Sequence, residues 1–336
     1  MRIGFNPHKD EIIKDAGYKH QIIIPVYIPN HEEYFTDSFA ILKLCLQSLF
    51  TTVHDKTFIT VVNNGSDIIV VDYLDSLLKE NKIQELIHTQ NIGKLNAILK
   101  GLAGSNIELV TISDSDVLFL NNWQTETINV FKSVPKAGVV GIVPQFKMYE
   151  SNCGNILFDT IFNSKLRFFP VKNRDSLIRF YDSIGWVRDY NKDYLNCNLG
   201  FKISESENVI VGSGHFVATY KRDIFDEIKT YIEFKMGGSS EQYLDKAPLK
   251  KDYWRVTTSD NHAFHMGNTL ESWMSIPVVN KTNNKNLEIN FSQNKKISPA
   301  LYFIKNKLFV KIISIKWIMK WYLKYKRLPK DMVENY

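Results

Sequence analysis

Residues 109–120, LVTISDSDVLFL, constrain the fold more than any other stretch of the chain. The apolar, β-branched run has the composition of a buried strand, and it ends in two carboxylates, Asp114 and Asp116, one residue apart. Like charges this close are costly to desolvate, which favours a cation beside them. Carboxylate oxygens suit Mg²⁺ or Mn²⁺. A strand-end turn is the alternative that the tripeptide alone leaves open, because Asp and Ser also favour turns.

Length, charge and cysteine content narrow the class of protein. A chain of 336 residues suits one large α/β domain or a domain with an appendage. The formal net charge of +6 does not indicate nucleic-acid binding, because much of the excess lies after Lys295. Cys45, Cys153 and Cys197 show no CxxC spacing, which argues against a disulfide framework or a zinc site. Together with a charged N-terminal segment, this predicts a cytoplasmic location.

Strand-like and helix-like patterns alternate through the first half of the chain. Strands are expected at 21–27, 58–62, 86–88 and 109–113, with helices between them, which predicts a parallel sheet covered on both faces. Polar clusters follow three of these strands, at Pro25–Tyr27, Asn63–Asp67 and Asp114–Asp116. Open parallel sheets bind ligands outside the carboxyl ends of their strands, so we expect the three clusters to meet in one crevice.

The second half has a less regular pattern. Residues 147–207 are irregular and aromatic-rich, which predicts a small second core and leaves a sugar-binding cleft as the alternative. Residues 209–220 return to strand character around Gly212-Ser213-Gly214, where a ligand can approach the backbone. A helix is expected at 239–250 with Glu241 in its first turn, and a late short strand ends near His265.

In this order, the motifs resemble those of family 2 glycosyltransferases with the GT-A fold. The resemblance rests on Pro25-Val26-Tyr27, Asn63-Asn64-Gly65-Ser66, Asn91-Ile92-Gly93-Lys94, Asp114-Ser115-Asp116, Gly212-Ser213-Gly214 with Lys221-Arg222-x-x-Phe225, and His265-Met266-Gly267. It implies a mixed, mostly parallel α/β sheet flanked by helices over 1–290. Within it, 20–145 would be the nucleotide-sugar half and 146–290 the acceptor half.

The resemblance also implies a function. It is metal-dependent transfer of a sugar from a nucleoside-diphosphate donor, with UDP-sugar the first choice, to a glycan or lipid-linked acceptor in cell-surface polysaccharide assembly. Asp114, Asp116 and His265 would hold Mn²⁺ or Mg²⁺, which neutralises the leaving diphosphate. The implied donor-binding residues are Pro25, Tyr27, Asn63, Asn91, Gly93, Lys94, Asp114 and Ser115, and the implied acceptor-side residues are Gly214 and His215.

A catalytic base is implied because an acceptor hydroxyl must lose its proton during attack. Glu241 is the candidate and Asp245, one turn on, is the reserve. The simpler alternatives are that Glu241 only complements a helix dipole and that His265 is an ordinary, partly buried imidazole.

Two departures from the family pattern leave alternatives open. Asn63 stands where an Asp is usual, and Glu241-Gln242 stands where a Glu-Asp pair is usual. An inverting mechanism therefore follows from the resemblance alone, and a retaining outcome is the alternative. A nucleotidyl- or phospho-sugar transferase on a similar scaffold and a non-catalytic glycan- or nucleotide-binding relative are the rival functions.

The C-terminal region, 291–336, is expected to form a basic amphipathic appendage. Residues 298–328 have helical periodicity with two apolar stripes flanked by lysines, and no apolar run approaches membrane-spanning length. This pattern predicts peripheral contact with the anionic inner face of the plasma membrane. Docking of this helix on protein or on a second subunit is the alternative.

Overall fold

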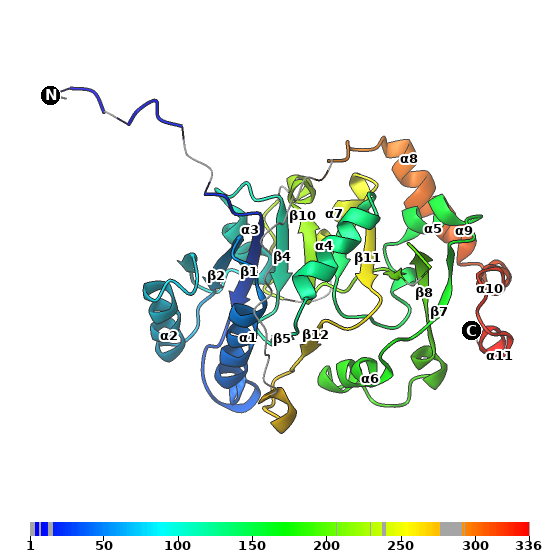
Figure 1. Ribbon diagram of the computed structural model, residues 1–336, viewed down its shortest axis with the longest axis horizontal. Helices are drawn as coiled ribbons and strands as arrows, with labels where there is room; N and C mark the ends of the chain where they lie inside the picture. Colours follow the sequence, from blue (N-terminus) through cyan, green and yellow to red (C-terminus); the bar gives the residue numbers. More distant parts are fainter. Residues whose placement is uncertain are drawn as a thin grey trace.

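A ten-stranded mixed sheet with helices on both faces forms the body of the protein (Figure 1). The computed structural model describes residues 4–6, 8–12, 16–205, 207–228, 230–236, 240–275, 291 and 293–335. The strand order is β3 (Glu85–His88), β2 (Thr57–Asn63), β1 (His20–Val26), β4 (Leu109–Ser113), β10 (Val217–Lys221), β6 (Ala137–Gly141), β11 (Trp254–Thr258), β9 (Asn208–Val211), β8 (Cys197–Lys202) and β7 (Leu166–Pro170). The predicted mixed α/β sheet is confirmed.

In the parallel block β3-β2-β1-β4, the strands β2, β1 and β4 are buried on both faces because apolar residues run through them with little alternation, whereas β3 at the edge is only partly buried. Ile22 and Ile24 pack against α1 (Ser38–Thr52) and α2 (Ile68–Lys79) on one face. Ile23, on the opposite face, packs with α3 (Lys94–Leu102) and α7 (Gln242–Lys250). The carboxyl ends of β1, β2 and β4 therefore lie at one edge between two helical layers.

A small second sheet adds to this edge. β5 (Val117–Phe119) pairs antiparallel with β12 (Ala263–His265), and His265 lies opposite Val117. The pairing brings residues almost 150 positions apart in the sequence to the end of β4. The helix α4 (Trp123–Ser133) follows β5 and packs against the second hydrophobic core.

Residues 147–207 are more regular than their sequence suggested. They form α5 (Gly154–Thr160), β7, α6 (Arg174–Ser183), the 3-10 turn η3 (Lys192–Leu195) and β8. The two strands extend the main sheet, since β8 pairs antiparallel with β9 and β7 pairs antiparallel with β8. The strand character expected at 209–220, with an interruption at Gly212-Ser213-Gly214, is observed as two strands, β9 and β10, on either side of that segment. These segments were difficult to predict because their partners are distant in sequence.

The C-terminal region is not the single helix predicted over 298–328. α8 (Pro299–Phe303), a π-helical turn (Ile304–Leu308) and α9 (Phe309–Ile313) form one rod, after which Ile315 has extended backbone and α10 (Lys316–Tyr325) and α11 (Lys330–Glu334) follow. The break lets Tyr322 and Leu323 enter the second core beside Ile313. Among the described helices, none has the length and hydropathy that a bilayer-spanning segment needs.

A partly buried ion cluster fixes this region to the body. Lys305 of the rod contacts Asp159 and Asp252, each at 2.7 Å, and Lys136 contacts the same two carboxylates at 2.5 and 2.8 Å. We call these four residues the structural cluster. Gly154 on α5 allows the close approach, since a Cβ there would lie 2.6 Å from the Lys305 carbonyl oxygen.

Candidate active site

A cavity of about 730 Å³ opens at the carboxyl edge of β1 and β4. Seven of the residues predicted from the sequence line it, together with several that were not predicted. The predicted ones are Pro25, Tyr27, Lys94, Asp114, Ser115 and Asp116, joined by His265 from β12. We expected three strand-end clusters to meet in one crevice; those after β1 and β4 line this cavity, and the cluster after β2 contributes Asn64.

Asp116 and His265 face each other because β5 and β12 pair. The Asp116 carbonyl oxygen accepts a hydrogen bond from Met266 N at 2.8 Å, and His265 Nε2 lies 3.4 Å from Asp116 Oδ2. The other imidazole nitrogen, Nδ1, is 2.9 Å from the hydroxyl of Ser183. Ser183 ends α6, in the segment that sequence reasoning described as irregular, so no local signal pointed to this partner.

Asp114 is paired with Lys94. The Lys94 amine lies 2.6 Å from Asp114 Oδ1 and 3.5 Å from Glu241 Oε1. Burial alone disfavours the charged amine, yet the surrounding carboxylates outweigh it and raise the pKa of Lys94 above its usual value. Lys94 therefore stays protonated in the cavity wall.

The backbone at Gly93 explains how Lys94 reaches the carboxylates. Gly93 has φ +87°, and a Cβ at this position would lie 2.8 Å from the carbonyl oxygen of Phe234. Asn91 supports the same loop, because its side-chain oxygen accepts from Gly93 N at 3.1 Å. Asn91 and Gly93 thus shape the loop that presents Lys94, and neither lines the cavity.

Asn63 also lies behind the cavity wall. It is buried, its amide group is 3.0 Å from His88 Nδ1, and its carbonyl oxygen accepts from Ser66 N at 2.9 Å. The next residue, Asn64, lines the cavity instead. The turn motif therefore places its second asparagine, rather than its first, in the wall of the cavity.

Glu241 and His215 form a close pair at the start of α7. His215 Nε2 is 2.8 Å from Glu241 Oε2, and its Nδ1 is 4.0 Å from Asp245. The hydrogen bond from His215 is the main reason that the pKa of Glu241 falls to about 2, against an opposing effect of burial. Burial would lower the pKa of His215, but Glu241 and Asp245 outweigh it and raise that pKa.

The reserve base, Asp245, has a different environment. Its Oδ1 accepts from Arg255, a buried side chain, at 2.5 Å. Gly214, the second predicted acceptor-side residue, packs against Gln145, and a Cβ there would overlap the amide of that side chain. Of the two predicted acids, Glu241 is the more accessible to an incoming hydroxyl, because Asp245 is neutralised by a buried guanidinium.

The carboxylates can be tested as donors for a divalent cation. Asp116 Oδ1 is buried without a hydrogen-bond partner in the described structure, and burial followed by the Asp114 charge raises the pKa of Asp116. This atom fits a cation that supplies the missing partner. Nevertheless, no three His, Cys, Asp or Glu side chains within the described ranges have the spacing of a metal site. Asp114 faces Lys94, so binding a cation through both aspartates requires Lys94 to move.

Other cavity-lining residues had no signal in the sequence. Aromatic side chains come from the segment after β1, polar ones from the end of α6, and further polar groups from the loop after β12; they include Tyr34, Phe35, Asp182, Ser183, Asn268 and Glu271. They join the cavity through tertiary packing of separate loops. Their combination of aromatic, amide and acidic groups can stack on a planar ring and hydrogen-bond hydroxyl groups.

Known proteins resemble this chain in sequence and in structure. The profile of the family described as "Glycosyl transferase family 2" matches residues 22–194. Among solved structures, S. aureus TarS 1-349 is 14% identical, with a TM-score of 0.42 over 73% of this chain and 60% of that chain. The same protein in complex with UDP-GlcNAc is 14% identical, with a TM-score of 0.44 over 92% of this chain and 71% of that one. No curated protein sequence matches.

Proposed function

Because this chain belongs to glycosyl transferase family 2, and is therefore a glycosyltransferase, we propose that it transfers a sugar from a nucleoside-diphosphate donor, with UDP-sugar the first choice, to a glycan or lipid-linked acceptor. The observation that carries the proposal is the cavity that exposes Asp114, Ser115 and Asp116 beside Lys94 and His265. Cationic and hydrogen-bonding groups meet there at the carboxyl edge of a parallel sheet, where such folds bind nucleotides.

The donor diphosphate would lie against Lys94. Its charged amine can offset the negative charge that grows on the leaving group when the bond to the anomeric carbon breaks. Asp116 and His265, with Asp114, would hold Mn²⁺ or Mg²⁺, which supplies Lewis-acid stabilisation of the same charge when bound. Tyr27 and Tyr34 line the cavity and offer aromatic faces for the base.

Glu241 would accept the acceptor's proton. The acceptor oxygen forms the new glycosidic bond, the electron pair of the old bond leaves on the diphosphate oxygen, and the hydroxyl proton passes to the carboxylate. With a pKa of about 2, Glu241 is a weak base, so it takes the proton only as the attacking oxygen becomes acidic in the transition state. His215 keeps the carboxylate ionised and oriented, and attack from this side would invert the anomeric centre.

A test of this function combines donors and variants. The protein is incubated with a panel of nucleotide sugars and Mn²⁺, and free nucleoside diphosphate is followed. Slow release of the diphosphate from one donor is the expected result. Release of pyrophosphate or of a nucleoside monophosphate would instead identify a nucleotidyl- or phospho-sugar transferase, and binding without turnover would identify a non-catalytic relative.

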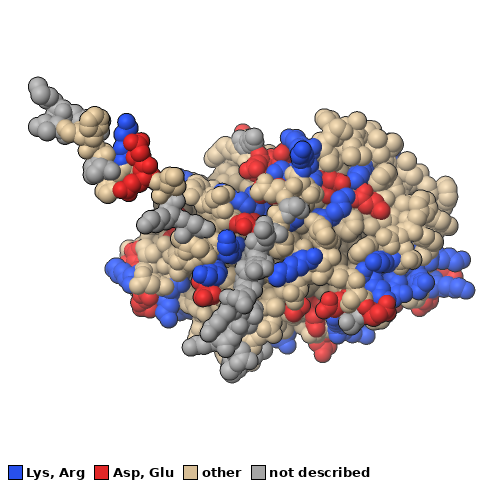
Figure 2. Space-filling model, turned by 45° about the horizontal axis from the view of Figure 1, so that its top comes forward, with Lys and Arg blue, Asp and Glu red and all other residues tan. Residues whose placement is uncertain are grey.

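The C-terminal helices would place the enzyme at the cytoplasmic face of the plasma membrane, in surface polysaccharide assembly. Basic side chains gather at the end of the molecule that these helices form (Figure 2). Trp317 and Trp321 of α10 are 72% and 51% exposed, which suits the membrane interface. Deleting 295–336 would also remove core residues such as Tyr322, so Trp317→Ser with Trp321→Ser is the better test. The double variant should lose binding to anionic liposomes, and unchanged binding would contradict the membrane contact.

A further inference from the structure

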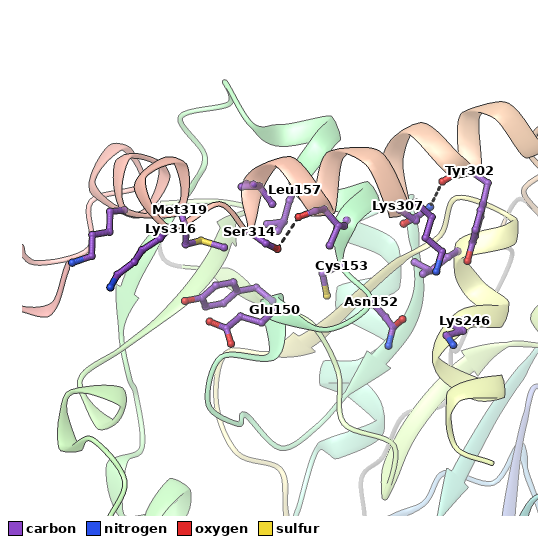
Figure 3. A pocket seen from close by; sticks show the side chains of 17 residues that line it. Glu150, Asn152, Cys153, Leu157, Lys246, Tyr302, Lys307, Ser314, Lys316 and Met319 are labelled. Atoms are coloured by element: carbon purple, nitrogen blue, oxygen red, sulfur yellow. Dashed lines mark hydrogen bonds between the residues drawn. The ribbon is translucent and has the colours of Figure 1, made fainter. Parts of the chain in front are cut away.

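A second cavity, of about 500 Å³, lies between the C-terminal rod, α5 and α7 (Figure 3). Its walls come from three separate parts of the chain and are held together by the structural cluster and by the close contact at Gly154. A cavity of this size is large enough for a small ligand. No part of the proposed transfer reaction uses it.

The cavity combines a cationic rim with an apolar wall. Among the described residues, four lysines and one carboxylate, that of Glu150, line it; the lysines are Lys246, Lys307, Lys316 and Lys320. Lys246 and Lys307 lie at one end, and Cys153, Leu157 and Met319 lie between them and Lys316 (Figure 3). Lys307 is exposed and forms no ion pair with any described residue. A ligand that satisfies both surfaces must carry an anion and a hydrocarbon portion.

The orientation of the rod agrees with a ligand that comes from a bilayer. Tyr302, Asn306 and Val310 face the cavity, whereas Ile304, Leu308 and Ile312 are 41%, 45% and 44% exposed. A step of two residues along a helix turns by about 200°, so this exposed apolar stripe lies on the opposite side of the rod. The rod thus separates an apolar outer face from a cationic inner cavity.

We infer that this cavity binds the phosphate-bearing end of an anionic amphiphile, with the phosphate between Lys246 and Lys307 and the hydrocarbon along Leu157 and Met319. Amine-to-phosphate contacts supply the charge complement, and the apolar wall removes methylene groups from water. The site is distinct from the donor cavity and does not rest on glycosyl transfer. It adds a specific binding site to the general attraction between lysines and an anionic surface.

The test uses the whole chain and soluble dihexanoyl phosphatidate below its micelle concentration, with binding followed by calorimetry. Lys307→Gln should weaken binding about tenfold, because a charged contact to phosphate is lost. The matched control is Lys311→Gln. Lys311 lies one helical turn after Lys307 and is also exposed, but it does not line the cavity, so this variant removes the same charge outside the proposed site. It should leave the affinity within about twofold. Equal losses in both variants would overturn the inference in favour of non-specific attraction.

Two further probes separate the sources of the phosphate. Inorganic phosphate should bind far more weakly than dihexanoyl phosphatidate, since it gains nothing from the apolar wall. Equal affinity for the two would overturn the amphiphile and identify a free-phosphate site. Sedimentation with phosphatidate-containing vesicles should show the same difference between Lys307→Gln and Lys311→Gln. Asp116→Asn, which targets donor turnover, should bind phosphatidate normally, so failure of one proposal is distinguishable from failure of the other.

Discussion

Two clusters of acids and lysines in this protein differ in charge balance and in access. The structural cluster matches Asp159 and Asp252 with Lys136 and Lys305, two charges of each sign. At the donor cavity, Asp114, Asp116 and Glu241 instead surround the amine of Lys94, although Glu241 does not line the cavity itself. Each cluster leaves a buried carboxylate oxygen without a hydrogen-bond partner in the described structure, Asp252 Oδ1 in the first and Asp116 Oδ1 in the second, but of the two only Asp116 lines the donor cavity. Charge imbalance at a cavity is the feature that marks a ligand site.

The sharpest way to test this distinction is Asp116→Asn. We expect diphosphate release to fall about 10³-fold, because Asp116 would be a ligand of the cation that stabilises the negative charge on the leaving group. The melting temperature should stay the same or rise, since the substitution removes a buried charge next to Asp114. Assays with Mn²⁺ and thermal unfolding give the two readouts. Retained turnover would remove Asp116 from the site.

Glu241→Gln tests the proton acceptor. We expect kcat to fall by at least about 10²-fold while KM for the donor is unchanged, because a general base acts in the transition state and the donor is held elsewhere. Asp245→Asn is the comparison. If that variant folds normally and loses turnover while Glu241→Gln keeps it, the reserve residue is the base.

The opposite result is expected in the structural cluster. Asp159→Asn should leave turnover per folded molecule unchanged and lower the free energy of unfolding by about 3 kcal/mol, because it leaves the Lys305 amine buried with a weakened partner set. Urea unfolding measures this loss. Glu205→Gln, which breaks an exposed pair with Lys202, should cost less than about 0.5 kcal/mol and serves as the control. A stable Asp159→Asn would show that Asp252 alone can hold both lysines.

The fold was predictable where the signal is local. The apolar runs of β1, β2 and β4 and the turn residues after them are contiguous in sequence, so periodicity and turn chemistry located them. The antiparallel extension of the sheet by β7 and β8 depends on pairing between strands that are distant in sequence. The many aromatic residues of this segment do not show the alternation of polar and apolar residues by which a strand is predicted. The break at Ile315 likewise follows from packing of Tyr322 and Leu323, which helical periodicity alone does not contain.

The site was predictable to the same extent. Strand-end motifs supplied Pro25, Tyr27, Lys94 and the aspartates, because each motif is short and its position in the fold follows from topology. The partners of the charged side chains were not predictable. The hydrogen bond between Ser183 and His265 and the ion pair between Lys94 and Asp114 are tertiary contacts between residues that are distant in sequence. No sequence motif marked Asp159 or Asp252, although both belong to the structural cluster of four charged side chains.

The smallest expected effect separates the two clusters by pH. In the structural cluster, the pKa of Asp159 is lowered from 3.8 and the pKa of Lys136 is raised from 10.5. The stability that the Asp159 charge contributes is lost only as pH falls below 3.8, and the stability that the Lys136 charge contributes is lost only as pH rises above 10.5. Both contributions are therefore fully present between these two pH values.

The pKa of His215 is raised from 6.5, so the stability that its pair with Glu241 contributes is fully present below 6.5 and is lost as pH rises through the raised pKa. Glu241→Gln should therefore lower the free energy of unfolding by no more than about 1 kcal/mol near pH 5.5, because both side chains reach solvent, and by less near pH 9, where only the 3.5 Å contact of Glu241 with Lys94 remains. Asp159→Asn should cost the same at both pH values. Urea titrations of the two variants at these pH values make the comparison, and a pH-independent loss in Glu241→Gln would mean that His215 is not the charge that holds this carboxylate.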